Sequence, residues 1–500
     1  MPENFRLDQG GLINRNKKIS FTFNGKKYFG YEGDTLASAL LANGIHLVGR
    51  SFKYHRPRGF FGAGVDEPYA IVQMNRNNEV DPNVRATEQE LFEGLEAKSV
   101  NCWPNVNFDI GAINNFLNKF FPAGFYYKTF MWPKSFWYKI YEPIIRKAAG
   151  FGSASIKHDK ERYEHKYEYC DLLIAGTGPS GLASAYAAAK NGAKVILAED
   201  KSRYGGSLLT SEVTIGNQSG QVWAEQIISE LKSMPNVIVK NRSQVFGYYD
   251  HNMLVMSERV SDHLPKTDKY TPKQRLWYIR AEEVVISSGS IERPLVFGNN
   301  DAPGVMLSSA AKEYLKIYGV LVGKKPIIFT NNDSGYETAI EFKKNGVDPI
   351  VLDTRKDPNS EIIKEAKELN INIKFSYVVV AAKGYKKVKS ADIAKISDDK
   401  KVLSNIENIK CDCICVSGFW TPTIHLASQS GNKTKFNEEI DAFVPSHSKQ
   451  KETTLGSANG IFTLEETLKT SFEKGSELSK QITNKENKIS IPTVVEKKII

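Results

Sequence analysis

Cysteine is scarce in this 500-residue chain, and its few cysteines do not form a redox pair. The sequence contains five cysteines, an odd number that argues against a disulfide framework and fits a reducing compartment. No C-x-x-C motif occurs, whereas a dithiol reductase needs two neighbouring cysteines beside its flavin. These absences disfavour a secreted disulfide scaffold and a free-standing disulfide reductase.

The chain also lacks long apolar runs and dense clusters of charge. No run approaches the roughly 18 apolar residues that a membrane helix needs, and the N-terminal segment has no signal-peptide core. The formal charge of +10 comes mostly from scattered lysine, without an arginine-rich tract or a nucleic-acid-binding motif. We therefore expect a cytoplasmic protein of about two to four domains, with no membrane and no nucleic-acid partner.

The strongest motif is a glycine turn between an apolar run and a helix of small residues. Within Asp171–Leu182, Gly176, Gly178 and Gly181 form the pattern G-x-G-x-x-G. The first glycine permits a tight turn, the second lets the backbone approach a pyrophosphate, and the third lets helix and strand pack closely. The next apolar run ends at Glu199, at about the spacing of an acid that binds an adenosine ribose. This pattern predicts a dinucleotide site.

A second glycine-containing segment follows Glu199 and extends the candidate site. Arg203 supplies a cation near the pyrophosphate, and Gly205 and Gly206 add flexible backbone. Glu199 disfavours the extra phosphate of NADP, although Lys201 and Arg203 leave that cofactor open. No nucleophile–base pair can be recognised, so the catalytic residues are unknown.

A second strand–helix–strand unit begins at Lys325 and has a weaker turn. The sequence predicts a strand over 326–329, a helix over 336–345 and a strand over 349–353. Its turn, Thr330–Gly335, contains one glycine instead of three, and Asp333 would repel a pyrophosphate. We therefore expect the scaffold of a nucleotide unit with an altered or lost site. Polar side chains of this turn could still bind a different ligand; they are Asn331, Asn332 and Ser334.

The N-terminal region has the pattern of a ferredoxin-like β-grasp module. A hairpin signal at Asn24-Gly25 is followed by a helix over 36–43 and a glycine-rich loop over 58–64. Ferredoxins bind their cluster with closely spaced thiolates, and Cys102 is the only cysteine in the first 169 residues. We therefore expect the fold without the cluster. The basic and aromatic stretch 50–58 is either an anion or cofactor contact at an interface or an exposed basic loop.

Residues 101–151 are unusually rich in aromatic side chains, which indicates a segment pressed against another domain or subunit, with an ordinary local core as the alternative. The rings are Phe120, Phe121, Phe125, Tyr126, Tyr127, Phe130, Trp132, Phe136, Trp137, Tyr138 and Tyr141. Near the other end of the chain, Cys411, Cys413 and Cys415 are expected on one face of a strand. Without a nearby histidine or fourth cysteine they predict buried small residues and no metal site.

Together these patterns predict an α/β fold of the FAD/NAD(P)-binding Rossmann-like type, with two dinucleotide domains as in disulfide reductases. A ferredoxin-like β-grasp domain that lacks cluster cysteines precedes it. The expected boundaries are 1–100 for the β-grasp domain, 101–165 for the aromatic connector, 166–485 for the FAD/NAD(P)-binding domain with its second unit at about 320–410, and 486–500 for a polar tail or linker.

The order of these parts resembles the alpha subunit of heterotetrameric sarcosine oxidase, from about Ile19 to about Ile482. The resemblance rests on four long strings, at 33–42, 49–59, 121–134 and 329–334. It implies oxidative demethylation of sarcosine with release of peroxide, in a complex with beta, gamma and delta subunits. The beta subunit would carry the amine-oxidising flavin, FMN would lie between alpha and beta, and tetrahydrofolate would accept the methylene group.

The resemblance also implies that the first dinucleotide site holds NAD as a structural cofactor. Flavoprotein reductases usually have Gly-Asp near the start of the final helix, where this sequence has Asn459-Gly460, which favours NAD over FAD. The implied NAD-binding residues are Gly176, Gly178, Ser180, Gly181, Glu199, Asp200, Lys201 and Ser207, with Val245, Ala458 and Leu464 as weaker candidates.

One departure from the family is large. The alpha subunit of the family continues into a folate-binding, aminomethyltransferase-like domain, and this sequence stops at Ile500, so tetrahydrofolate is expected only if that half is present elsewhere. Two alternatives remain open. One is an alpha-type subunit of a related opine, proline or glycine dehydrogenase, several of which keep cysteines where this chain has Gly62-Ala-Gly64. The other is a non-catalytic assembly platform stabilised by NAD.

Overall fold

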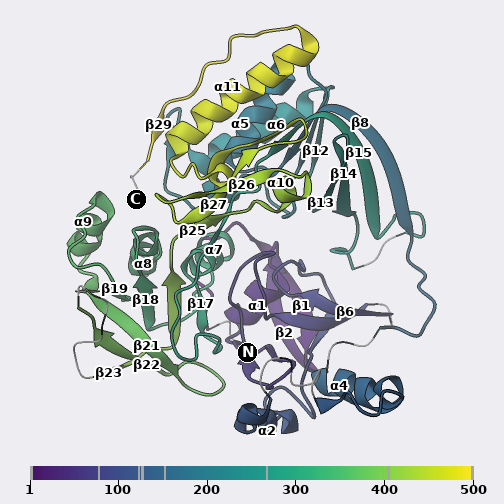
Figure 1. Ribbon diagram of the computed structural model, residues 1–500. Helices are drawn as coiled ribbons and strands as arrows, with labels where there is room; N and C mark the ends of the chain where they lie inside the picture. The colour runs from purple at the N-terminus through teal and green to yellow at the C-terminus, as the bar shows by residue number, and fades with distance from the viewer. Residues whose placement is uncertain are drawn as a thin grey trace. The chain divides into compact units, whose positions relative to one another are not determined.

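The computed structural model describes residues 4–496, except 77–78, 122–123, 125–128, 151, 153, 266–267, 398, 400 and 402–405. The chain forms two compact units, whose elements are labelled in Figure 1. Unit 1 contains residues 1–160, 294–359 and 363–418, and unit 2 contains 161–293, 360–362 and 419–500. Among the described residues, no helix combines the length and apolar content that crossing a bilayer requires.

The N-terminal part of unit 1 is a five-stranded sheet with strand order β2-β1-β7-β5-β6, packed on helix α1. The predicted hairpin is confirmed, because Asn24 and Gly25 both have positive φ, 51° and 76°, between two antiparallel strands. Thr35 begins α1 with a reciprocal capping box to Ser38, and every residue of α1 is buried. The β-grasp prediction is therefore confirmed. Its elements are β1 (Asn14–Phe23), β2 (Lys26–Glu32), α1 (Leu36–Ala42), β3 (Gly49–Arg50), β4 (Pro57–Arg58), β5 (Ile71–Arg76), β6 (Glu79–Arg85) and β7 (Leu95–Ser99).

A buried carboxylate organises the loop that carries the cluster in ferredoxins. The side chain of Glu67 accepts four backbone N–H bonds, from Phe61 (2.6 Å), Gly62 (2.8 Å), Tyr69 (2.6 Å) and Ala70 (3.0 Å). Burial raises the pKa of Glu67, and the four hydrogen bonds oppose that rise. In a ferredoxin such N–H groups bond to the cluster sulfurs, so an internal anion satisfies the loop here.

The connector consists of short helical turns that expose most of their side chains. None of its helical elements contains a buried residue. Phe125, Tyr126 and Tyr127 lie outside the described residues. The elements are η1 (Ile110–Ala112), α2 (Ile113–Phe116), η2 (Asn118–Phe120), the π-helical turn η3 (Trp137–Tyr141) and α4 (Glu142–Ala149).

The rest of unit 1 is the second strand–helix–strand unit predicted from the sequence. Its parallel sheet has the order β17-β24-β18-β19-β20, and the central strands are buried on both faces, as their apolar runs require. A three-stranded antiparallel sheet, β21-β22-β23, follows. The elements are β17 (Val305–Leu307), α7 (Ser308–Tyr318), β18 (Pro326–Thr330), α8 (Ser334–Lys344), β19 (Ile350–Asp353), α9 (Glu361–Glu368), β20 (Asn372–Phe375), β21 (Tyr377–Lys383), β22 (Ser390–Lys395), β23 (Glu407–Lys410) and β24 (Cys413–Ser417).

The three cysteines near β24 do not share one face. Cys411 packs with Ile414 and Val416, whereas Cys413 and Cys415 alternate with those residues along the strand. All three thiols are buried, and no group of metal-ligating side chains occurs among the described residues.

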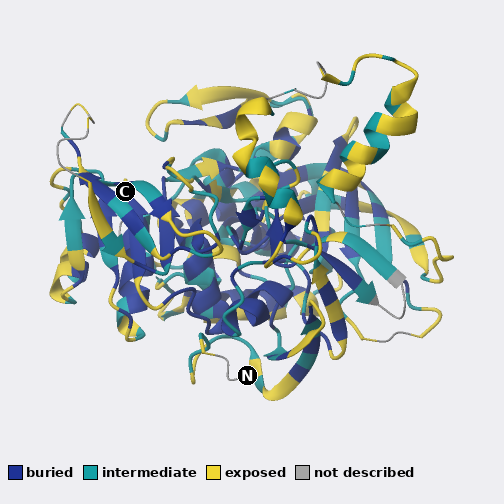
Figure 2. Ribbon diagram, turned by 90° about the horizontal axis from the view of Figure 1, so that it is seen from below, coloured by how far each residue is buried: buried dark blue, intermediate teal, exposed yellow. Residues whose placement is uncertain are grey.

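Unit 2 is built on a sheet with strand order β12-β9-β8-β15-β14-β13, to which β28 adds beside β15. Helices α5, α6 and α11 share one hydrophobic core with one face of this sheet, and they lie together in Figure 1. Figure 2 colours the buried residues of the chain dark blue and the exposed ones yellow. The strands are β8 (Tyr163–Ala175), β9 (Val195–Ala198), β10 (Thr214–Ile215), β11 (Gln218–Ser219), β12 (Val237–Lys240), β13 (Ser243–Tyr249), β14 (Met253–Arg259), β15 (Gln274–Ile286), β16 (Ser290–Glu292), β25 (Trp420–Pro422), β26 (Lys433–Asn437), β27 (Ala442–His447), β28 (Glu452–Thr454) and β29 (Val494–Val495). The helices are α5 (Pro179–Lys190), η4 (Gly206–Leu209), α6 (Gly220–Ser233), α10 (His425–Gln429), η5 (Gly456–Asn459) and α11 (Leu464–Thr483).

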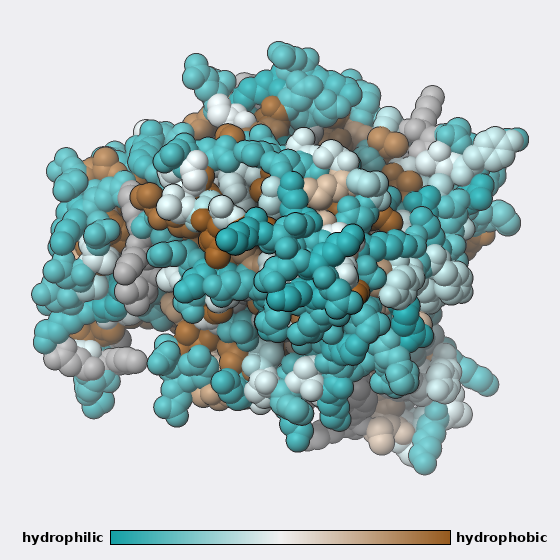
Figure 3. All heavy atoms as spheres, turned by 90° about the horizontal axis from the view of Figure 1, so that it is seen from above, coloured by the Kyte–Doolittle hydropathy of each residue, from teal (hydrophilic) through white to brown (hydrophobic). Residues whose placement is uncertain are grey.

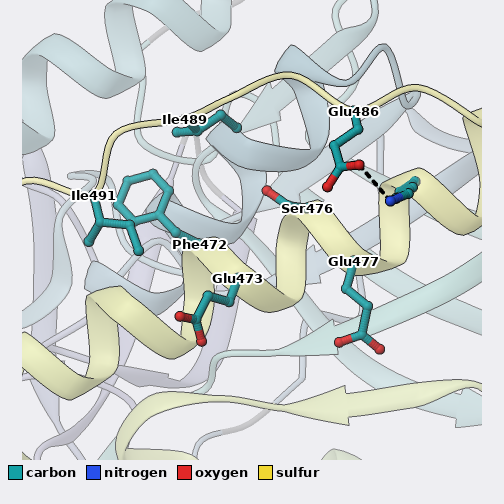
Figure 4. A pocket seen from close by; sticks show the side chains of 8 residues that line it. Phe472, Glu473, Ser476, Glu477, Glu486, Ile489 and Ile491 are labelled. Carbon is teal, nitrogen blue, oxygen red and sulfur yellow. Dashed lines mark hydrogen bonds and ion pairs between the residues drawn. The ribbon is translucent and has the colours of Figure 1, made fainter.

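The C-terminal segment packs on unit 2, although the sequence predicts a polar tail or linker. Strand β29 pairs with β10, and the Glu496 carboxylate accepts the N–H groups of Leu464 (2.9 Å) and Glu465 (3.1 Å) at the start of α11. Figure 4 shows a groove between α11 and this segment, crossed by an ion pair between Lys480 and Glu486. Its other lining residues are Phe472, Glu473, Ser476, Glu477, Ile489 and Ile491.

Candidate functional site

The predicted glycine turn joins β8 to α5, and two of its three glycines are required by close packing. Gly176 has a φ of 110°, and a Cβ there would lie 2.3 Å from the Ser287 carbonyl oxygen. A Cβ on Gly181 would lie 1.9 Å from the carbonyl oxygen of Gly176. The first glycine therefore allows the turn, and the third lets α5 approach the strand, as the sequence predicts.

The second glycine, Gly178, faces open space. A Cβ on Gly178 would have no protein atom within 4 Å, although its backbone is extended and suits any residue. Beside the turn, the hydroxyl of Ser287 is buried without a hydrogen-bond partner. Open space at the start of a helix of small residues, next to an unsatisfied hydroxyl, fits the pyrophosphate of a dinucleotide.

Glu199 follows β9 and lies against the turn. It is 7% exposed, and its carboxylate accepts the N–H of Thr177 at 3.0 Å, the Thr177 hydroxyl, and the N–H of Lys201 at 3.1 Å. Burial raises the pKa of Glu199 to about 8, Asp200 adds to the rise, and the bonds from Thr177 and Lys201 oppose it. The carboxylate is thus next to the glycine turn, where an acid for the ribose hydroxyls is expected.

The Arg203–Ser207 segment is brought to the same turn. Gly205 has a φ of 118° and donates its N–H to the Thr177 carbonyl oxygen at 3.1 Å. A Cβ on Gly206 would lie 2.8 Å from Cα of Gly178. Arg203 is half-buried and Ser207 is exposed. The segment therefore forms a second wall of the candidate site.

The remaining predicted residues lie on four other elements of unit 2 and in the loop after β9. Ser180 is in the first turn of α5, next to η5, because a Cβ on Gly456 would lie 2.8 Å from its hydroxyl. Ala458 is buried in η5, and Leu464 begins α11. Val245 is in β13 and packs on the core that contains Ala198. Asp200 directs its carbonyl oxygen to Arg259 at 3.1 Å.

Two residues of this site were not predicted. Thr177 is a variable position of the G-x-G-x-x-G pattern, and only the structure shows that it joins Glu199 to Gly205. Ser287 follows β15, and its unsatisfied hydroxyl has no signal in the sequence.

The second turn has the same position in its sheet and is filled by side chains. Asn332 stands where the first turn has Gly178, and its amide donates to the Ser417 carbonyl oxygen at 3.2 Å. Its side-chain oxygen Oδ1 accepts the N–H of Ser334 at 2.9 Å, at the beginning of α8. Arg355 makes ion pairs with Asp333 (2.7 Å) and Asp353 (2.8 Å). The structure agrees with an altered turn that lacks space for a pyrophosphate.

The arginines of the basic stretch 50–58 bond to other residues of unit 1. Arg50 is 3% exposed and donates to the carbonyl oxygens of Val106 and His55. Arg56 and Arg58 both pair with Asp301, at 2.6 Å and 2.5 Å. The three arginines of this stretch therefore have partners within unit 1.

Comparison with protein families now places the chain. Residues 170–447 match the model of the pyridine nucleotide-disulphide oxidoreductases. The chain belongs to that family. Residues 16–102 match a 2Fe-2S iron-sulfur cluster binding domain, but Cys102 is the only cysteine among them. Burial raises the pKa of the Cys102 thiol to about 11, and a single neutral thiol does not fit a cluster.

Individual relatives confirm the predicted resemblance. The sarcosine oxidase subunit alpha of Rhizobium meliloti (strain 1021) is 46% identical over 91% of this chain and 45% of its own length. That of Corynebacterium sp. (strain P-1) is 30% identical over 93% of this chain and 44% of its own length. The chain thus spans about half the length of these relatives. A crystal structure of L-proline dehydrogenase from P. horikoshii superposes with a TM-score of 0.61 at 18% identity, over 96% of this chain and 75% of that one, and confirms the fold.

Proposed function

We propose that this oxidoreductase-family chain is the NAD-binding, alpha-type subunit of a multisubunit sarcosine oxidase. In the complex, sarcosine would be demethylated to glycine with release of peroxide, and the amine would be oxidised on a beta subunit. The glycine turn of unit 2 would hold NAD. FMN would lie against this chain at the contact with the beta subunit, and gamma and delta subunits would complete the assembly.

The open position at Gly178 carries this proposal. Gly176 and Gly181 are required by packing alone, whereas no packing contact requires a glycine at 178. A ligand that brings phosphates close to the backbone explains it. Ser287 adds an unsatisfied hydroxyl, and Glu199 adds an acid for the ribose. The 46% identity to a sarcosine oxidase subunit alpha supports the choice of reaction.

NAD is preferred over FAD because of the start of α11. Asn459-Gly460 replaces the Gly-Asp that flavoprotein reductases use, and Gly460 has a φ of 80°. In addition, the carboxylate of Glu496 already accepts the first N–H groups of α11. A bound dinucleotide would supply its nicotinamide, and the residues of this chain would bind and orient it.

Activity measured with and without the beta subunit tests the proposed reaction. The purified chain should not consume sarcosine, and adding the amine-oxidising beta subunit should restore glycine and peroxide production. Turnover of sarcosine by the chain alone would contradict the proposal. Acceptance of the methylene group by tetrahydrofolate should need a polypeptide homologous to the remaining half of the relatives, and this is tested by adding that half separately.

A related dehydrogenase subunit is the second candidate. The similarity in fold to L-proline dehydrogenase favours it, since that structure covers 96% of this chain. Proline and opines should then replace sarcosine as substrates of the assembled complex. A non-catalytic platform is the third candidate. It predicts that FMN titrated into the reconstituted alpha–beta pair does not contact this chain.

A further inference from the structure

The connector of unit 1 exposes six large aromatic side chains, which we call the aromatic face. They are between 67% and 82% exposed: Trp103, Phe108, Phe116, Phe120, Trp132 and Tyr138. Side chains of this size bury about 200 Å² each, so the six expose roughly 900 Å². One partner in a stable complex buries about 800 Å² of surface in total. By contrast, the surface in Figure 3 is mostly hydrophilic with scattered hydrophobic side chains.

One loop holds both halves of the connector together. His55, which has a positive φ of 53°, contacts the Asp109 carboxylate through Nδ1 at 2.6 Å and the Ala148 carbonyl oxygen through Nε2 at 3.0 Å. Asp109 begins η1, and Ala148 is near the end of α4. The adjacent Tyr54 donates its hydroxyl to the Phe121 carbonyl oxygen at 2.6 Å. These bonds tie η1, Phe121 and the end of α4 to the loop at 54–55; α2 and α4 lie at the bottom of the view in Figure 1.

The charges around the aromatic face have one sign. Within 101–150 the sequence has two carboxylates: Asp109 is buried against His55, and Glu142 pairs with Arg146 at 2.8 Å. The exposed cations are Lys119, Lys134, Lys139, Arg146 and Lys147. Two copies of this face would repel each other, so a second copy of the chain is disfavoured. A partner with an apolar centre and a carboxylate rim fits.

We propose that the aromatic face is the docking surface for the amine-oxidising subunit of the same oxidase. This inference rests on the proposed function. The connector lies between the two regions matched by family models, 16–102 and 170–447, so neither domain type includes it. Both relatives above are named as subunits, which favours a protein partner. An anionic membrane would also attract aromatic and basic side chains, and it is an outcome of the test.

Binding of the full-length chain to its purified amine-oxidising subunit tests this surface. Replacing Phe116, Trp132 and Tyr138 together by Ser should weaken the complex about a hundredfold, because buried aromatic anchors dominate interface energies. The matched control is Tyr167→Ser with Tyr270→Ser, which changes two other side chains that are 76% and 66% exposed. The control should bind like the wild type, and both variants should keep the wild-type NAD content.

Reversing the charge of exposed lysines separates the electrostatic effect on the association rate from the packing of the aromatic side chains. Replacing Lys119, Lys134 and Lys147 by Glu should slow association about tenfold at low salt, and the difference should vanish at about 0.5 M salt. A control triple with Lys364, Lys386 and Lys410 replaced by Glu changes exposed lysines of the same unit and should have no effect. Hydrogen exchange should show protection of 103–121 and 129–150 in the complex.

The outcomes distinguish this inference from the proposed function. If the wild-type chain forms no complex with the subunit, both are wrong. If a complex forms, with protection elsewhere and unchanged binding of the serine variant, the docking surface alone is wrong. Binding to vesicles containing about one-third phosphatidylserine that the serine variant loses, with subunit binding unaffected, would identify a membrane surface and overturn it. Self-association of the isolated chain through 103–150 would overturn it as well.

Discussion

The two strand–helix turns of this chain have the same strand register. The space at the first turn is open, whereas side chains fill the second. In the first, Ala175 pairs with Ala198 and Ile286 on the two neighbouring strands. In the second, Phe329 pairs with Leu352 and Val416. This common register makes Gly178 equivalent to Asn332, Ser287 to Ser417, and Glu199 to Asp353.

At two of these equivalent positions, a group that is left available in the first turn is occupied in the second. Gly178 faces open space, whereas the Asn332 side chain fills that position and bonds to the strand and helix. The hydroxyl of Ser287 has no partner, whereas that of Ser417 lies 3.3 Å from the Asn332 amide. In the second turn, side chains bond to the start of the helix, and the strand order around the turn is the same as in the first.

The largest expected effect concerns the third glycine of the first turn. Gly181→Ala should destabilise unit 2 by at least about 3 kcal/mol, because the new Cβ meets the Gly176 carbonyl oxygen, which cannot rotate away. Thermal unfolding followed by circular dichroism measures the loss. Gly178→Ala is the matched control and should unfold like the wild type. Equal stability of the two variants would show that α5 does not pack as described.

Removing the cation of the second turn should have the next largest effect. Arg355→Ala should destabilise unit 1 by about 3 kcal/mol, because Asp333 and the fully buried Asp353 lose their counterion. Denaturant unfolding measures the change, and Arg355→Lys, which keeps the charge, should lose less. The NAD content of the purified variant should not change. A parallel loss of NAD would indicate that the second turn takes part in binding.

Substitution of the second glycine should separate binding from folding. Gly178→Ala should weaken NAD binding by about tenfold to a hundredfold, because its methyl group enters the space that the pyrophosphate needs. Its stability should stay unchanged or rise by up to about 1 kcal/mol. Calorimetric titration of NAD measures the affinity. Wild-type affinity in this variant would place the dinucleotide elsewhere.

The smallest effect is a pH dependence due to Glu199. Ribose hydroxyls donate to the ionised carboxylate, and the pKa of Glu199 is raised to about 8, so NAD affinity should increase as the pH rises through that value. In the ligand-free chain, folding stability changes with pH in the opposite direction to NAD affinity. The contribution of Glu199 to stability is present below its ordinary pKa of 4.5 and is lost as the pH rises through about 8. The expected change in affinity between about pH 6 and 9 is up to tenfold. The titration of Glu199→Gln should be flat, and an unchanged slope would assign the effect to another group.

Much of the fold could be predicted because local signals and burial agree. The hairpin at Asn24-Gly25, the cap at Thr35 and the small-residue helix α5 each have short-range patterns that packing then uses. The failures depend on contacts between residues far apart in sequence. The packed segment before Glu496 is polar and lysine-rich, and its order depends on contacts with β10 and α11, which are distant in sequence.

The candidate site was predictable in its glycines and not in its polar contacts. The spacing of Gly176, Gly178 and Gly181 follows from what a phosphate turn requires, so sequence alone identifies them. The assignment of the three arginines of the stretch 50–58 to internal partners could not be read from the sequence. Asp301 is more than 240 residues away from Arg56 and Arg58. The NAD-binding residues themselves remain a prediction.

The NAD content of the purified chain tests the central claim most directly. Nucleotides released by acid should contain about one NAD per chain in the wild type, and NAD should be nearly absent when Gly178 is replaced by Leu. Replacement of Asn332 by Ala should leave the content at about one, although it should lower stability by about 1–2 kcal/mol through loss of the helix cap. FAD in place of NAD, or loss of NAD on changing Asn332 but not Gly178, would contradict the account.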